Sequence, residues 1–112
     1  MDQTAKLDRY RAVIAEVLQR HAAMEAEPRN YETAVLCDRK TDEYRLIDTE
    51  ITPEKRQEYV VVQLALRQGQ VWIERDGIEY GIGQDLLEAG IPAEDIVVGF
   101  AHGRPLTLAE AA

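Results

Sequence analysis

The sequence predicts one α+β domain built from an N-terminal helix, a four-stranded antiparallel sheet and a C-terminal helix, with both helices on one face of the sheet. Length is the first reason, because 112 residues can form one hydrophobic core but not two. Composition is the second, because 46% apolar and 30% charged residues is the balance of a folded chain. The third is a change from helical spacing of apolar residues to short β-branched stretches. We therefore treat residues 1–112 as a single domain.

The first helix is predicted over about residues 4–26. Apolar side chains and one histidine recur there every three or four residues, which places them on one face of a helix. Pro28 ends the helix, because its ring excludes the helical conformation from the preceding residue. The face consists of Leu7, Tyr10, Ile14, Val17, Leu18, His21 and Met24.

Four strands are predicted after the helix, from stretches rich in β-branched and aromatic residues. The connections between them are too short for a parallel crossover, so the strands should pair antiparallel in chain order. In the third strand, strongly apolar residues alternate with milder ones, and the helices should cover the former. These apolar residues are Val60, Val62, Leu64 and Leu66, and the strands span residues 32–37, 44–49, 59–67 and 70–75.

The last third of the chain begins at a turn formed by Asp76 and Gly77, and a short helix is predicted over about residues 80–89. Gly90 and Pro92 end that helix, because glycine tolerates the left-handed conformation and proline cannot continue a helix. An apolar stretch over residues 96–100 then precedes a tail whose position the sequence does not predict.

Charge disfavours direct binding to nucleic acid. The formal net charge is -8, and Lys and Arg form no continuous basic stripe of the kind that neutralises phosphates. No secretory signal and no run of about 18 apolar residues occurs, so neither export nor membrane insertion is indicated. Cys37 is the only cysteine, which agrees with a cytoplasmic compartment.

No cofactor or metal site is predicted. Neither His21 nor His102 has a Cys or His partner at ligand spacing, so we interpret His21 as a packed or rim residue and His102 as a surface residue. The acids Glu74, Asp76 and Glu79 are too few for a calcium loop and are interpreted as solvated turn charges.

A candidate interface lies on the milder face of the predicted sheet. Trp72 alternates with Val71 and Ile73, so it should lie away from the helices together with Val61 and Ala65. Tryptophan is over-represented at interface centres, although Trp72 could instead cap the sheet edge. The sequence therefore predicts a homo-oligomer, most simply a homodimer, through Val61, Ala65 and Trp72.

One stretch of sequence is similar to a known family. The segments GQVWIERDG (residues 69–77), GI (81–82) and LEAGIPAEDIVVGF (87–100) resemble the XisI family, the excision controlling factor proteins of a cyanobacterial DNA element. The resemblance implies an accessory role in DNA excision beside a recombinase and a companion protein, XisH, which resembles endonuclease folds. This sequence departs from the family pattern at three places: Gln63 and Ala65 stand where the family often has a histidine and an acid, Asp48-Thr49 stands where it often has Gly-Trp, and Ala101 replaces its usual histidine.

We therefore expect a non-enzymatic accessory protein that binds a protein partner such as an XisH-like protein. The alternatives are a DNA-binding controlling factor and a small enzyme with an unrecognised site. In residues 76–100, where the resemblance is densest, we expect structural roles, because the polar members of this segment include no base or nucleophile. Asp76 and Gly77 should reverse the chain, Gly90 should cap the helix, Pro92 should fix its exit, and Phe100 should anchor the tail.

Overall fold

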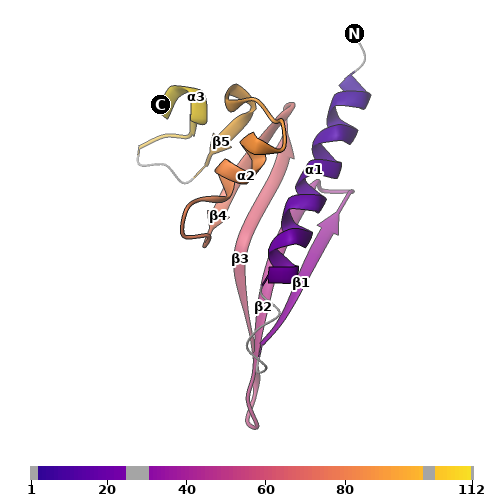
Figure 1. Ribbon diagram of the computed structural model, residues 1–112, viewed down its shortest axis with the longest axis vertical. Helices are drawn as coiled ribbons and strands as arrows, with labels where there is room; N and C mark the ends of the chain where they lie inside the picture. The colour runs from indigo at the N-terminus through magenta and orange to yellow at the C-terminus, as the bar shows by residue number, and fades with distance from the viewer. Residues whose placement is uncertain (1–2, 25–30, 100–102, 112) are drawn as a thin grey trace.

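The computed structural model describes residues 3–24, 31–99 and 103–111 and has an α+β architecture (Figure 1). The long first helix, the four antiparallel strands and the short second helix are present as predicted, with ends that differ by a few residues. The elements are α1 (Gln3–Met24), β1 (Tyr31–Asp38), β2 (Glu43–Ile51), β3 (Arg56–Arg67), β4 (Gln70–Asp76), α2 (Ile82–Glu88), the 3-10 turn η1 (Ala93–Asp95), β5 (Ile96–Val98), β6 (Leu106–Thr107) and α3 (Leu108–Ala111).

The sheet has six strands and is mixed, so the prediction of a four-stranded antiparallel sheet is wrong in this respect. The strand order is β1-β2-β3-β4-β5-β6. Neighbours pair antiparallel except β4 and β5, which are parallel over three residues each. The cause is the connection between them, which contains α2 and is long enough to carry the chain back to the same end of the sheet.

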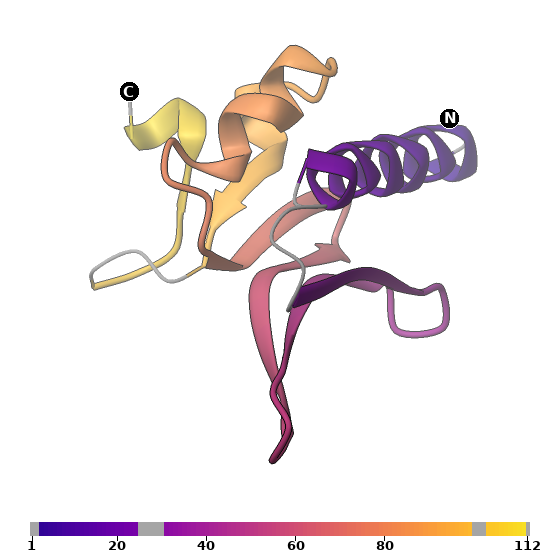
Figure 2. The ribbon, with the colours of Figure 1, turned by 60° about the horizontal axis from the view of Figure 1, so that its bottom comes forward.

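Both main helices cover the same face of the sheet, as predicted (Figure 2). One buried cluster contains residues from α1, from α2 and from the helix-facing side of β2, β3 and β4. The cluster consists of Tyr10, Ile14, Val17, Leu18, Tyr44, Leu46, Val62, Leu64, Leu66, Val71, Ile73, Ile82, Leu86, Ile91 and Ile96.

None of the helices in the described ranges is long and apolar enough to cross a membrane.

The alternation predicted for β3 is wrong at Val60 and Val61, because the strand contains a β-bulge there. Leu46 pairs with Val62 but the next residue of β2, Ile47, pairs with Val60, so Val61 is an extra residue in its strand. Because the extra residue shifts the alternation, Val61 packs against the buried cluster although the pattern placed it on the opposite face. Val60 was predicted to face the helices, but it is not part of that cluster, and neither is Ile47, the residue with which it pairs.

The hairpin of β2 and β3 projects beyond the rest of the sheet (Figure 1). Its turn is closed by a hydrogen bond from the Thr52 amide to the Lys55 carbonyl, 2.9 Å long. The residues from Pro53 to Tyr59 are exposed. The projection contributes to an elongated molecule, with extents of 53 × 31 × 23 Å.

Candidate functional site

A cleft with a volume of about 1000 Å³ lies between the end of α1, the bulged part of the hairpin and the loop after β4. Helix α1 contributes His21 and Met24, and β2 contributes Asp48. Strand β3 contributes Val60 and Val61, and residues 74–80 form the remaining wall. The lining thus contains both apolar and charged side chains, and most of the charged ones are acidic.

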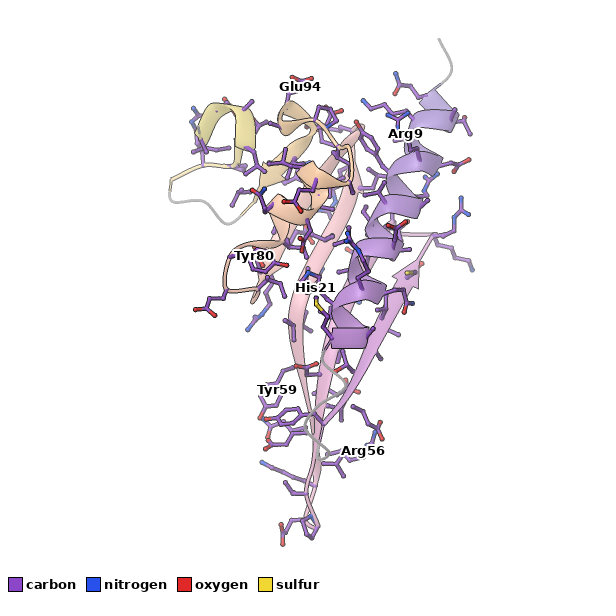
Figure 3. All side chains as sticks on the ribbon, viewed as in Figure 1. Arg9, His21, Arg56, Tyr59, Tyr80 and Glu94 are labelled. Atoms are coloured by element: carbon purple, nitrogen blue, oxygen red, sulfur yellow. The ribbon has the colours of Figure 1, made fainter. Side chains whose placement is uncertain are left out.

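A hydrogen-bonded group of three side chains stands beside the cleft. Nε2 of His21 lies 2.5 Å from Oδ2 of Asp85, and the Tyr80 hydroxyl donates to the same oxygen over 2.8 Å. The Tyr80 hydroxyl is also 3.3 Å from Nε2 of His21. His21 is only 5% exposed, whereas Tyr80 is 61% exposed (Figure 3). The group joins α1 to α2 and presents one aromatic ring to solvent.

The electrostatics of this group favour a carboxylate at Asp85. Burial by itself would raise the pKa of Asp85, but the hydrogen bonds with His21 and Tyr80 outweigh burial and lower the pKa below its usual value. The hydrogen bond to Asp85 raises the pKa of Tyr80. The arrangement therefore holds a charged carboxylate between two helices and keeps its neighbouring phenol protonated.

The loop that forms one wall of the cleft is fixed by Asp76 at the end of β4. Its Oδ1 accepts from the Ile78 amide over 3.0 Å, and its Oδ2 accepts from the Ile82 amide over 2.9 Å. The Gly77 amide donates to the Val61 carbonyl over 2.7 Å. A Cβ at position 77 would lie 3.0 Å from that carbonyl oxygen, so the close approach requires glycine. Asp76 and Gly77 thus set the direction in which the chain leaves the sheet.

The residues that were expected to end the second helix lie directly after α2. Gly90 has a φ of +106°, a conformation that glycine adopts at little cost. Its amide donates to the Leu87 carbonyl, and the Ile91 amide donates to the Leu86 carbonyl. Pro92 is in an extended conformation immediately before η1. Phe100 and His102, by contrast, lie outside the described residues.

The three candidate interface residues do not form one exposed surface. Val61 packs against the buried cluster, Ala65 is 0% exposed and Trp72 is partly buried. Trp72 pairs with Ala65 on one side and with Val97 on the other, and Val97 is itself buried. The expectation of an exposed apolar face is therefore wrong for Val61 and Ala65.

Next to Ala65, the outer face of the sheet carries a polar network. Arg45 donates to Gln63 and Gln63 donates to Glu74, over 2.7 and 3.1 Å. Arg67 bonds to Glu74 and, over 3.3 Å, to Glu43. This part of the outer face therefore carries paired charges.

Two members of the three-residue group beside the cleft were not identified from sequence. His21 was predicted to be a packed or rim residue, and it is buried beside the cleft, but Tyr80 and Asp85 carried no motif. Asp85 lies 64 positions from His21, and no spacing rule relates residues on two different helices. Only a prediction of how α1 crosses α2 could have brought them together. Among the described residues, no group of three or more His, Cys, Asp or Glu side chains could hold a metal ion.

Comparison with known proteins identifies the family. A crystallised XisI-like protein from Anabaena variabilis superposes with a TM-score of 0.76 at 20% identity, covering 85% of this chain and 87% of that one. The fdxN element excision controlling factor XisI from the same organism gives a TM-score of 0.73 at 29% identity, covering 88% and 95%. No curated protein matches significantly. The family model for XisI proteins matches residues 1–111, which confirms the resemblance found in the sequence. This chain is therefore a member of the XisI family.

Proposed function

We propose that this chain is a cytoplasmic, non-enzymatic accessory protein of DNA element excision that acts by binding another protein at the cleft beside Tyr80. The family supports the biological context, since a relative of similar fold is named an excision controlling factor. The observation that carries the proposal is the rim of the cleft. Met24 and Tyr80, at 66% and 61% exposure, are the two most exposed large hydrophobic side chains of the described residues, and both line it.

Such a rim fits a protein partner better than a small substrate. Tyrosine and methionine are enriched at protein interfaces, where they supply apolar contact area. The cleft wall also carries Asp48 and Glu79, and the chain as a whole has a net charge of -8. A basic surface on the partner would complement it, as expected for a protein that handles DNA, such as an XisH-like nuclease-fold protein.

The test is capture of a purified XisH-like protein by Tyr80 variants. Tyr80→Ala should reduce capture at least about tenfold, since an exposed aromatic anchor is lost. Tyr80→Phe is the matched control. Like Tyr80→Ala it lacks the hydroxyl, but it keeps the ring, so it should bind as the native chain does. Equal binding by all three proteins would contradict a partner site at this cleft.

A second measurement separates the proposal from direct DNA binding. The isolated protein should not bind duplex DNA at physiological ionic strength. Its net charge is -8, and its Lys and Arg residues form no continuous basic stripe that could replace the counterions on phosphates. Salt-sensitive binding that Tyr80→Ala leaves unchanged would instead favour a DNA-binding controlling factor. Substrate turnover by the purified protein would favour the enzyme alternative.

A further inference from the structure

The outer edge of β1 is the long open edge of the sheet. Strand β1 has eight residues, lies at one end of the strand order and, among the described residues, pairs only with β2 (Figure 1). The strand at the other end, β6, has two residues. Unpaired backbone groups along an edge of this length are a template for another strand, and the short β6 offers no equivalent surface.

The direction of the open backbone groups follows from two hydrogen bonds of the hairpin. The Thr52 amide donates to Lys55 and the Asp42 carbonyl accepts from Leu66, so even-numbered residues of β2 direct their backbone groups toward β3. Odd-numbered residues of β2 therefore face β1. Because the register pairs Glu32 with Thr49, the even-numbered residues of β1 are bonded to β2. The N–H and C=O groups of Tyr31, Thr33, Val35 and Cys37 consequently point outward.

This edge lacks the devices that usually prevent strand addition. Residues 33–37 contain no proline and no charge, and no bulge interrupts the pairing of β1 with β2. Leu36 is 51% exposed, and Ala34 is also exposed on the face of β1 that points away from the buried cluster. The edge is thus both chemically open and apolar.

The sequence of β1 is self-complementary in one antiparallel register. When a two-fold axis passes through Ala34, the residues whose backbone groups point outward pair with one another across the two copies. Thr33 then pairs with Val35, and Tyr31 with Cys37. Glu32 then lies opposite the exposed Leu36 rather than opposite another acid. A register centred on Val35 would instead place Glu32 opposite Asp38, and like charges directly opposite are unfavourable.

A groove beside the edge fits the same arrangement. It has a volume of about 270 Å³ and lies between α1 and β1, where Ala12 and Ala15 leave space next to Cys37. In the register centred on Ala34, Tyr31 of a second copy lies opposite Cys37 and its ring can enter this groove.

We propose that two copies of this chain associate by antiparallel pairing of their β1 strands about a two-fold axis at Ala34, which joins two six-stranded sheets into one. The pairing uses a surface separate from the cleft, so it does not depend on the proposed protein partner.

Two substitutions of Leu36 test the register by charge in sedimentation experiments on the full chain. Leu36→Glu faces Glu32 of the second copy twice per dimer and should raise the dimer dissociation constant about tenfold or more. Leu36→Lys faces the same glutamates with opposite charge and should keep the dimer at least as tight as Leu36→Ala does. Circular dichroism checks that all variants stay folded, which is expected at a half-exposed position. A native chain that remains monomeric at high micromolar concentration would overturn the proposal, as would equal effects of Glu and Lys.

Cross-linking tests the axis directly. In a Cys37→Ser background, Ala34→Cys places two thiols at a non-hydrogen-bonded pair, where Cα atoms are about 4.5 Å apart and a disulfide can form. Leu36→Cys in the same background is the control, because its two copies would be roughly 13 Å apart along the strands. Oxidation should yield a covalent dimer from the first variant only. Cross-linking of both, or of neither, would overturn pairing at Ala34.

Discussion

Nε2 of His21 on α1 lies 2.5 Å from Oδ2 of Asp85 on α2. Both helices cover the same buried cluster, so this contact fixes how they lie relative to each other above the sheet. Tyr80 completes the hydrogen bonding of the same carboxylate oxygen from the edge of the cleft.

Asp85→Asn should destabilise the fold by about 1–3 kcal/mol at neutral pH, because it removes the charge from a largely buried hydrogen-bonded group. The pKa of Asp85 is lower in the folded protein than in the unfolded chain, so its contribution is present above the unfolded value of about 3.9. The contribution is lost as the pH falls through the folded pKa. Urea unfolding of both proteins at pH 7 and at about pH 3 measures this, and the difference should shrink in acid. Glu88→Gln, on the exposed side of α2, is the control, and a difference independent of pH would contradict a charged Asp85.

Alkaline titration should show that the two buried tyrosines, Tyr10 and Tyr44, ionise well above the ordinary pKa of a phenol. Burial, together with hydrogen bonds to Asp95 and Asp42, raises the pKa of Tyr10 and of Tyr44 to about 12. Because both pKa values exceed the unfolded value of about 10, the folded state should lose stability as the pH rises from about 10 toward about 12. Ultraviolet absorbance of phenolate, recorded with urea unfolding, measures both effects.

Tyr44→Phe is the matched variant for the titration, and it should remove part of this alkaline loss of stability. Titration of Tyr10 and Tyr44 near the ordinary pKa of about 10, in a protein that stays folded, would refute the assignment.

Substitution of two glycines should destabilise the fold for different reasons. Gly90→Ala should cost about 1 kcal/mol through backbone conformation alone, since no atom lies within 4 Å of the added Cβ but φ is +106°. Gly77→Ala should cost about 1–3 kcal/mol through crowding against the Val61 carbonyl. Thermal unfolding of both variants checks the magnitudes. If Gly90→Ala were neutral, glycine would not be needed for the end of α2.

Glu94→Gln should leave both stability and partner capture unchanged. The side chain is exposed on η1 (Figure 3). The group that Gln70 contacts is the backbone carbonyl of Glu94, which the substitution keeps. Thermal unfolding and the capture assay are the two measurements. Capture that fails while the melting temperature is unchanged would show that residues 93–95 form part of a recognition site.

The sequence was most informative where periodicity runs over many residues. The face of α1 that contains Ile14 and Leu18 and the alternation of Val62, Leu64 and Leu66 predicted the buried core. Strands β5 and β6 were missed because three and two residues are too few to establish a period. Their pairing depends on the return of the chain through α2, which is a tertiary effect.

The candidate site was harder to predict than the fold. Val61 is an extra residue in β3, and a one-residue bulge leaves no signature in a run of valines. The burial of Ala65 depends on side chains of neighbouring strands rather than on its own small size. The proximity of His21 to Asp85 likewise required two separate helices to be placed on the sheet.

The order of the strands in the sheet is also their order along the chain, and this order should determine which strands fold last and unfold first. Strands β1 to β4 can form by closing successive short loops, whereas β5 must wait until the crossover through α2 is complete. The β5 and β6 pairings are also the shortest of the sheet. We therefore expect amide hydrogens of this end to exchange first with solvent, while the meander of β1 to β4 remains protected under α1.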